Sequence, residues 1–371
     1  MKSKIYKYDF LILGAGLIGT LCGLKLIQKN FKALVVEKNK NTKFDQRTLA
    51  VNANSRDFLN TLGLWEGLSQ EPINEIIIKD YINTDTLYFD NSTESMGSVI
   101  YNKDLLLKAR SRLIQKNALI ENVDLQIENL NTNSPLKIKN KLYTFKKIII
   151  SVGKNYLSNK KITKKNFKSN HHSVVGFFFH SSKHHNKAYE IFTKEGPLAV
   201  LPSPNKKNYL STFIYSTKNN YNKNEICSLI KKYFTTTHGK ITFSNSFYNF
   251  KISPHMSISK DENFFLIGDS LRSIHPVAGQ GWNLGIKDIE TLCELLERYA
   301  LDDPVLILSY YAKRKIEGFA YLTFTSFLND IYEKNNLFSQ FKIKIAFQSL
   351  RIFSPLRNKF IKSAMGRYNL I

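Results

Sequence analysis

Three observations in the sequence predict an α/β fold built on a buried parallel sheet. A short apolar run over residues 8–13 leads into a glycine-rich turn and then into apolar residues at helical spacing. A second apolar run over residues 33–37 completes a β-α-β unit with a right-handed crossover. Two more apolar runs, at 148–150 and 264–267, have the pattern of strands that return to the same sheet. This arrangement is typical of a Rossmann-type domain.

The segments between these strands predict a second domain inserted into the first. Residues 54–65 and 102–116 have helical patterns, and residues 73–89 alternate like paired strands. The stretch from 174 to 215 is rich in strands, and beyond Pro304 the pattern is helical to the end. We therefore expect a discontinuous nucleotide-binding domain (1–70, 97–165 and 262–300), a mixed-sheet substrate domain (71–96 and 166–261) and a C-terminal helical region (301–371).

Composition and charge restrict the class of protein. The chain has 371 residues, of which 43% are hydrophobic and 23% charged, and this balance excludes a disordered, collagenous or coiled-coil protein. A net charge of +24 attracts polyanions, but the lysines are scattered and no nucleic-acid-binding motif is present, so we expect no nucleic-acid partner. Apolar runs are shorter than the roughly 18 residues of a membrane-spanning helix, so the chain is expected to touch a bilayer at most.

Cysteine and histidine spacing predicts neither a disulfide framework nor a metal site. The three cysteines lie far apart and without a C-x-x-C pair, which fits a reducing compartment such as the cytoplasm. They are Cys22, Cys227 and Cys293. Five histidines lie between 171 and 185, but no aspartate, glutamate or cysteine lies at metal-ligand spacing from them. We interpret that segment as an exposed hairpin and expect no metal there.

The turn after the first strand carries Gly14-x-Gly16-x-x-Gly19. Such glycines allow a tight turn, close approach to a pyrophosphate and close packing of helix on strand, while the helix N-terminus faces the phosphates. Glu37 ends the next strand, where its carboxylate can accept hydrogen bonds from a ribose 2′-hydroxyl. An ordinary glycine-rich turn is the alternative, but the strand and helix on either side favour a dinucleotide site. The fingerprint does not separate NAD from FAD.

A second motif lies about 250 residues further along the chain. A predicted strand runs into Gly268-Asp269, and it is followed by His275-Pro276-Val277-Ala278-Gly279-Gln280-Gly281-Trp282-Asn283. With these residues the chain resembles the aromatic-ring flavoprotein monooxygenases, the para-hydroxybenzoate hydroxylase superfamily, which carries Gly-Asp followed by Pro-x-x-Gly-Gln-Gly-x-Asn. A helix start marked by proline and glycine is the alternative interpretation.

The resemblance implies FAD as the cofactor. It implies that Asp269 binds the ribityl chain and that a helix N-terminus stabilises charge on the reduced flavin. The backbone beneath the isoalloxazine would come from Gly279, Gln280, Gly281 and Asn283. Arg47 lies where the family carries an arginine near the flavin, although a surface arginine in a basic protein is the alternative. His275 and Pro276 are further candidates for catalytic residues, and no acid or base can be named.

Further segments narrow the resemblance to the ubiquinone-biosynthesis hydroxylases. These segments are residues 188–202, the form Ala278–Gly285 of the flavin motif, residues 353–366 and the turn Gly63-Leu64-Trp65. The resemblance implies a monooxygenase that hydroxylates the ring of a polyprenylated phenol, with O2 as oxidant and NAD(P)H reducing FAD. Other quinone-biosynthesis proteins are then potential partners.

Two positions depart from the family pattern. The aspartate of an Asp-Gly motif after the returning strand is Val152 here, and a Glu-Asn pair is Tyr101-Asn102. Because the Asp-Gly motif is associated with NAD(P)H reduction, these changes leave a second hypothesis open, a non-catalytic FAD-binding scaffold of a quinone-biosynthesis complex. A flavin-dependent reductase of prenyl chains shares the first fingerprint, but the Gly-Gln-Gly segment disfavours it.

The C-terminal stretch from 337 to 365 combines apolar and basic residues, a composition typical of an interfacial amphipathic helix. Its apolar members are Phe338, Phe341, Ile345, Phe347, Leu350, Phe353 and Phe360, and its basic members are Lys342, Lys344, Arg351, Arg357, Lys359 and Lys362. Packing on the FAD domain explains the pattern equally well. We therefore predict a cytoplasmic protein, with an anionic membrane surface on the inner face of the membrane as a candidate partner.

Overall fold

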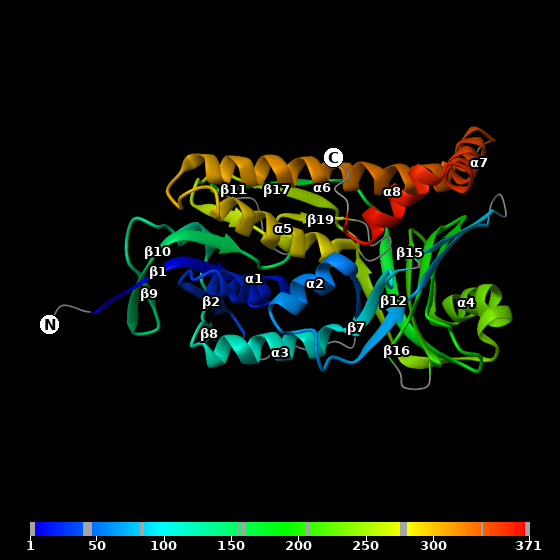
Figure 1. Ribbon diagram of the computed structural model, residues 1–371, viewed down its shortest axis with the longest axis horizontal. Coiled ribbons are helices and arrows are strands. Elements are labelled where there is room, and N and C mark those ends of the chain that lie inside the picture. The colour runs from blue at the N-terminus through cyan, green and yellow to red at the C-terminus, as the bar shows by residue number, and fades with distance from the viewer. Residues whose placement is uncertain are drawn as a thin grey trace.

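The computed structural model of the protein describes residues 4–39, 47–81, 85–91, 93–154, 156, 160–204, 208–274, 280–334 and 337–367, with only the backbone of Ser246, Gln280 and residues 324–334 and 337–339. The molecule is elongated (Figure 1). A parallel sheet with its helices occupies one end, and a large antiparallel sheet occupies the other. The long helix α6 (Pro304–Lys334) runs from the first end towards the second.

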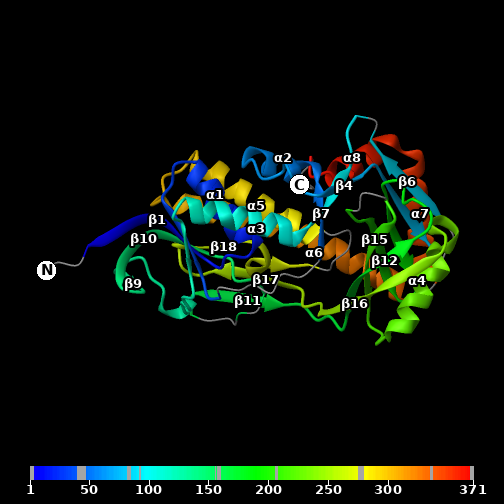
Figure 2. The same ribbon diagram turned by 90° about the horizontal axis from the view of Figure 1, so that it is seen from below.

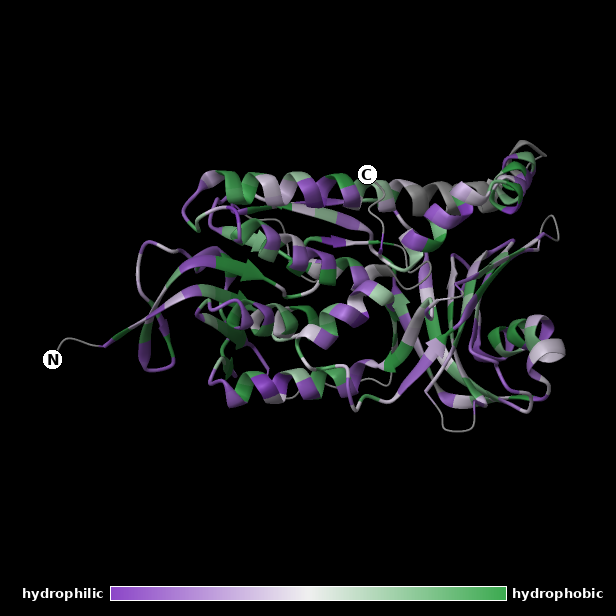
Figure 3. Cartoon of the chain, viewed as in Figure 1, coloured by the Kyte–Doolittle hydropathy of each residue, from purple (hydrophilic) through white to green (hydrophobic). Residues whose placement is uncertain are grey.

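The parallel sheet has the strand order β18-β10-β1-β2-β8, and β9 (Leu136–Ile138) pairs antiparallel with β10. Its strands are β1 (Ile5–Leu13), β2 (Ala33–Glu37), β8 (Leu119–Glu121), β10 (Lys141–Ile150) and β18 (Phe264–Leu266). Three helices pack on one face of it, α1 (Leu17–Gln28), α3 (Asn102–Gln115) and α5 (Gln280–Leu296). Because β18 pairs with β10, the late strand joins the early sheet as the sequence predicts. In Figure 3 these strands are mostly hydrophobic and the helices carry polar outer positions.

The antiparallel sheet has the order β16-β12-β15-β14-β13-β5-β6. Its strands are β5 (Glu75–Asp80), β6 (Thr86–Asp90), β12 (His172–His180), β13 (Lys187–Thr193), β14 (Gly196–Pro202), β15 (Leu210–Thr217) and β16 (Ile241–Lys251). Helix α4 (Lys223–His238) packs on it through Ile226, Ile230 and Phe234. The helix begins at a capping box of Asn222 and Glu225, which satisfies two backbone amides.

Two small sheets complete the fold. One has the order β3-β7-β4, formed by β3 (Thr48–Asn52), β7 (Gly97–Tyr101) and β4 (Gln70–Ile73), with α2 (Ala53–Thr61) following β3. The other has the order β11-β17-β19, formed by β11 (Ile162–Asn166), β17 (His255–Ser259) and β19 (Arg272–Ser273). Short 3₁₀ turns occur at Ile127–Asn129 and Gly268–Ser270. The division into a nucleotide-binding domain, a substrate domain and a C-terminal helical region stays a proposal.

The chain beyond Pro304 is helical, as predicted, with α6 followed by α7 (Leu337–Ile352) and α8 (Ser354–Ala364). Two tyrosines of α6 attach it to the parallel sheet. Tyr310 donates to the carbonyl of Leu266 at 2.8 Å, and Tyr311 donates to that of Phe264 at 2.9 Å. Figure 2 shows α7 and α8 beside β6 at the far end of the molecule. Among the described helices, none is long and apolar enough to cross a membrane.

The expectation of an exposed histidine hairpin is wrong. His180 and His184 are less than a tenth exposed, and the end of α4 brings His238 against them. The ring centroids of His180 and His238 lie 4.7 Å apart, and those of His180 and His184 lie 5.9 Å apart. Burial lowers the pKa of His184 to about 4 and that of His238 to about 3, so both are neutral at pH 7. The described part of the chain holds no group of three or more potential metal ligands.

Candidate functional site

The first glycine motif forms the turn from β1 into α1. Gly14 has a φ of +100°, and a Cβ there would lie 2.4 Å from the carbonyl oxygen of Ser151. A Cβ on Gly19 would lie 2.0 Å from the carbonyl oxygen of Gly14. A Cβ on Gly16 meets nothing within 4 Å, and this residue is exposed. The first and third glycines are therefore required by the protein's own packing, whereas the second borders open space.

That open space suits a phosphate group. Gly16 is the N-cap of α1, and no side chain caps the helix. The amides of the first turn are therefore available to an anion at the positive end of the helix dipole. Glu37 lies beside the turn, because its carboxylate accepts from the amide of Ala15 at 2.7 Å and from that of Asn39 at 3.1 Å. Each carboxylate oxygen keeps a further acceptor site, which a ribose hydroxyl can use.

The second motif follows β18. Gly268 has a φ of +58°, and its amide donates to Asp288 at 2.8 Å. The side chain of Asp269 is exposed, yet burial raises its pKa, and the charges of Lys154, Arg47 and Arg272 oppose this rise. A carboxylate that reaches solvent and is also surrounded by protein lies within a cleft. This is the environment that a ribityl-binding aspartate needs.

Ile18 brings the two motifs together. A Cβ on Gly268 would lie 3.2 Å from the Ile18 side chain, and one on Gly285 would lie 2.7 Å from it. The start of α1 therefore packs directly on the Gly268-Asp269 turn and on α5. A Cβ on Gly281 meets none of the described atoms within 4 Å, so among the described residues the beginning of α5 is also open. Both glycine-bearing helix starts thus lie around the same turn.

Some of the predicted flavin-site residues lie outside the part of the chain that the structure describes. His275, Pro276 and Gly279 lie outside the described residues, as does the side chain of Gln280. Asn283 is described and is 5% exposed. Its side chain accepts from the amide of Asn52 at 3.2 Å and donates to the carbonyl of Ala50 at 3.0 Å, so it joins α5 to β3.

Arg47 lies where the nucleotide-binding side meets the large sheet. Its guanidinium carbon is 4.7 Å from the ring centroid of Phe250 on β16, and its carbonyl accepts from the amide of Asn102 at 3.0 Å. Its charge also acts on Asp269. A fixed cation is therefore present at the edge of the cleft, and its place near the flavin stays a prediction.

The two departures from the family pattern also lie at this boundary. Val152 follows β10 and is 37% exposed. Tyr101 ends β7, and its hydroxyl donates to the carbonyl of Pro204 at 3.0 Å. Lys154 donates to the carbonyl of Lys251 at 2.8 Å and is the strongest charge opposing the raised pKa of Asp269. The cleft is thus more cationic beside Val152, because Lys154 is charged and the family's aspartate is replaced by a neutral valine.

Sequence reasoning missed the buried ion pairs behind the second motif. Asp288 on α5 is fully buried, and it accepts from Arg272 at 2.8 Å and from Arg314 at 2.7 Å. Since Asp288 also holds the amide of Gly268, this cluster fixes the turn that presents Asp269. The charged pair Lys287-Asp288 between Ile286 and Ile289 was the only signal in the sequence.

The chain has relatives among known proteins. The FAD binding domain family matches residues 162–325, which include the second motif. Ubiquinone hydroxylase UbiL of Rhodospirillum rubrum is 22% identical over 98% of this chain and 90% of its own. Ubiquinone biosynthesis monooxygenase COQ6 of Dictyostelium discoideum is 22% identical over 97% of this chain and 91% of its own.

Solved structures show the same fold. p-Nitrophenol 4-monooxygenase PnpA of Pseudomonas putida matches with a TM-score of 0.74 at 12% identity, covering 99% of this chain and all of its own. PqsL of Pseudomonas aeruginosa, described as a probable FAD-dependent monooxygenase, matches with a TM-score of 0.67 at 15% identity, over 89% of this chain and 97% of its own. The chain therefore carries a match to the FAD binding domain family, has the fold of FAD-dependent monooxygenases, and is similar over nearly its whole length to proteins of ubiquinone biosynthesis.

Proposed function

We propose that this chain hydroxylates the aromatic ring of a polyprenylated phenol in ubiquinone biosynthesis, with O2 as oxidant and NAD(P)H as reductant. One observation carries the proposal. The two FAD motifs pack on one another through Ile18, in a chain related over nearly its whole length to proteins named ubiquinone hydroxylases. Bound FAD supplies the redox chemistry by which this family activates O2.

In this proposal the groups of the protein bind FAD and orient the substrate ring. The amides at the start of α1 hold the pyrophosphate, Glu37 accepts from the ribose, and Asp269 accepts from the ribityl hydroxyls. Arg47 stabilises negative charge that develops at the edge of the cleft. His275, Pro276, Gly279, Gln280, Gly281 and Asn283 stay candidates for the flavin-ring contacts. Arg47 contacts Phe250 of the large sheet, and in this proposal that sheet forms the side of the site that takes the reacting ring.

The proposal is tested with the purified holoprotein. We expect it to retain non-covalent FAD, to oxidise NAD(P)H when a short-chain prenyl phenol is added, and to release the hydroxylated ring. A folded protein that takes up no FAD would contradict the cofactor assignment. In cells, a deletion strain should accumulate the unhydroxylated quinone intermediate, whose structure identifies the ring position.

Val152 and Tyr101 favour a second candidate function, a non-catalytic FAD-binding scaffold. The family aspartate is absent at Val152, and the hydroxyl of Tyr101 contacts the chain near Pro204. Anaerobic mixing of the holoprotein with NAD(P)H separates the two functions, because a scaffold binds FAD that stays oxidised, whereas an enzyme bleaches the flavin absorbance.

A polyprenylated substrate resides in the bilayer, so the enzyme must receive it at the membrane surface or from another protein. We propose that the protein is cytoplasmic and meets an anionic membrane surface, or another quinone-biosynthesis protein that delivers the substrate. The net charge of +24 supports attraction to anionic lipid.

A further inference from the structure

Helix α7 carries apolar residues on two opposite sides. One side packs inward, where Ile343 and Phe347 are less than a tenth exposed and contact the cluster around Phe89 and Met96. The other side faces solvent, with Phe341 61%, Ile345 46% and Ile352 82% exposed. Residues 341, 345 and 352 share one face, because a helix turns by about 100° per residue. Packing within the chain therefore accounts for only one of the two faces.

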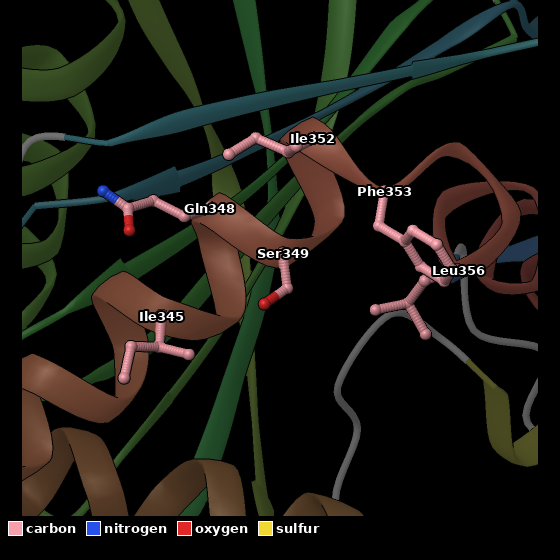
Figure 4. A pocket seen from close by; sticks show the side chains of 6 residues that line it. All are labelled: Ile345, Gln348, Ser349, Ile352, Phe353 and Leu356. Atoms are coloured by element: carbon pink, nitrogen blue, oxygen red, sulfur yellow. The ribbon is translucent and has the colours of Figure 1, made fainter.

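The start of α8 extends the exposed face. Phe353 is 58% exposed and Leu356 is 42% exposed, and both follow Ile352 at the corner between the two helices. A hollow of about 470 Å³ lies at this corner (Figure 4). It is lined by Ile345, Gln348, Ser349, Ile352, Phe353 and Leu356. We name the exposed apolar residues 341, 345, 352, 353 and 356 the α7–α8 patch.

Basic residues flank the α7–α8 patch. By helical spacing, Lys342 lies on one side of the exposed stripe of α7, and Lys344 lies on the other, and both are exposed. Lys359 and Lys362 on α8 are also exposed. The sequence from 334 to 371 contains no aspartate or glutamate. Figure 3 shows hydrophobic and hydrophilic positions side by side along α7.

We propose that the α7–α8 patch docks on an anionic lipid bilayer. Apolar side chains exposed between lysines match the interface of such a bilayer, where the rings and aliphatic chains enter the acyl boundary and the ammonium groups meet the phosphates. A second copy of the chain is a poor partner, since each copy carries a charge of +24 and this segment holds no compensating acid. The patch lies at an outer corner of the molecule, which a flat surface can reach (Figure 1).

The attachment of α7 to the protein gives the docking a function. Arg351 donates to the carbonyl of Thr86 at 3.1 Å, and Arg357 donates to that of Tyr88 at 2.8 Å, so both helices are tied to β6 of the large sheet. Docking through the patch therefore holds the large antiparallel sheet at the membrane surface. This role rests on the proposed function, because a prenylated substrate arrives from the bilayer.

Vesicle co-sedimentation of the FAD-loaded protein tests the docking. The probes are vesicles of phosphatidylcholine alone and of phosphatidylcholine mixed with phosphatidylglycerol. We expect binding only to the anionic vesicles at low salt, and its loss at high salt. Substituting Lys342, Lys344 and Lys359 by glutamine should weaken binding by about a hundredfold, since each basic residue near an anionic surface contributes about fivefold. The matched control replaces Lys137, Lys139 and Lys141 by glutamine, which removes the same charge at the hairpin of β9 and β10.

A second pair of variants tests the apolar contribution. Ile345→Gln with Ile352→Gln should abolish binding, whereas Leu107→Gln with Ile114→Gln, exposed apolar residues of α3, should leave it unchanged. Thermal unfolding shows that each variant is folded. Equal binding of the patch and control variants would overturn the proposal, as would a wild-type dimer that the patch variants convert to monomer. Vesicle binding needs no turnover, so an inactive protein that binds would contradict only the proposed function, and an active one that does not bind would contradict only the docking.

Discussion

The glycine loop and the α7–α8 patch lie at different parts of the molecule and are constrained in different ways. At the loop, a single methyl group on Gly19 would lie 2.0 Å from a backbone oxygen, so one residue type fits. On α7, Ile352 is 82% exposed and its identity does not affect internal packing. The difference teaches that the cofactor end is specified by contacts within the chain, whereas internal packing does not account for the exposed apolar residues of the α7–α8 patch.

The largest effect is expected behind the cofactor turn. Asp288→Asn removes the charge that Arg272 and Arg314 share, and it should lower the free energy of unfolding by about 3–5 kcal/mol. Glu294→Gln on the exposed side of the same helix is the control and should change it by less than about 0.5 kcal/mol. Urea unfolding measures both, and equal midpoints would show that the buried cluster does not hold the cofactor end.

The next effect concerns acid stability at the opposite end. The folded pKa values of His184 and His238, about 4 and about 3, lie below the unfolded value of 6.5. The unfolded chain therefore binds more protons as the pH falls below 6.5, and stability falls through the window from 6.5 down to about 3. At pH 5 each histidine should cost about 2 kcal/mol.

His238→Phe tests this acid effect directly. Its Nε2 is buried without a hydrogen-bond partner among the described residues, so a phenyl ring is tolerated beside Phe178. The variant should be as stable as the wild type at pH 8 and more stable at pH 5. An unchanged pH profile would contradict the buried neutral state.

A smaller effect is expected at Asp269, the proposed ribityl-binding residue. Asp269→Ala removes a charged acceptor in the cleft and should weaken FAD binding by about ten- to a hundredfold without lowering the stability of the apoprotein. Glu262→Ala, exposed before β18, is the control. Fluorescence titration with FAD measures both variants, and wild-type affinity in Asp269→Ala would remove this residue from the site.

The sequence predicts the local turns of the protein better than it predicts contacts between distant elements. Gly14, Gly19 and Gly268 were predictable because each belongs to a turn of known sequence form: Gly14 and Gly268 have a positive φ there, and a Cβ on Gly19 would meet Gly14 of the same turn. The partners of Asp288 were not, because Arg272 and Arg314 reach it from separate elements. The histidine cluster was mispredicted for the same reason, since only the end of α4 brings His238 to His180. Local spacing predicts turns, and it does not show which distant elements meet.

A moderate effect is expected on the rate of FAD reduction when Val152 is replaced. Val152→Asp restores a hydrogen-bonding carboxylate after β10 and should speed anaerobic reduction of FAD by NAD(P)H by about tenfold. Val152→Asn is the matched control for charge. Rapid reduction of the unmodified protein would show that other residues replace the motif, and it would remove the support for a scaffold function.

The smallest effect on stability is expected at the patch. Ile352→Gln should change the free energy of unfolding by less than about 0.5 kcal/mol, because its side chain is exposed. Phe347→Gln on the buried side of α7 should lower it by several times more. A large loss in Ile352→Gln would mean that this face packs within the protein, and the two regions would then be alike.

The most direct test of the central claim is turnover under ¹⁸O2. The FAD-loaded protein is mixed with NAD(P)H and a prenylated phenol, and the product is analysed by mass spectrometry. We predict one hydroxyl group on the aromatic ring that carries the ¹⁸O label, with one NAD(P)H consumed for each product, and no product from Asp269→Ala until excess FAD is added. NAD(P)H oxidation that forms only hydrogen peroxide, or an unlabelled ring in a protein saturated with FAD, would contradict the account.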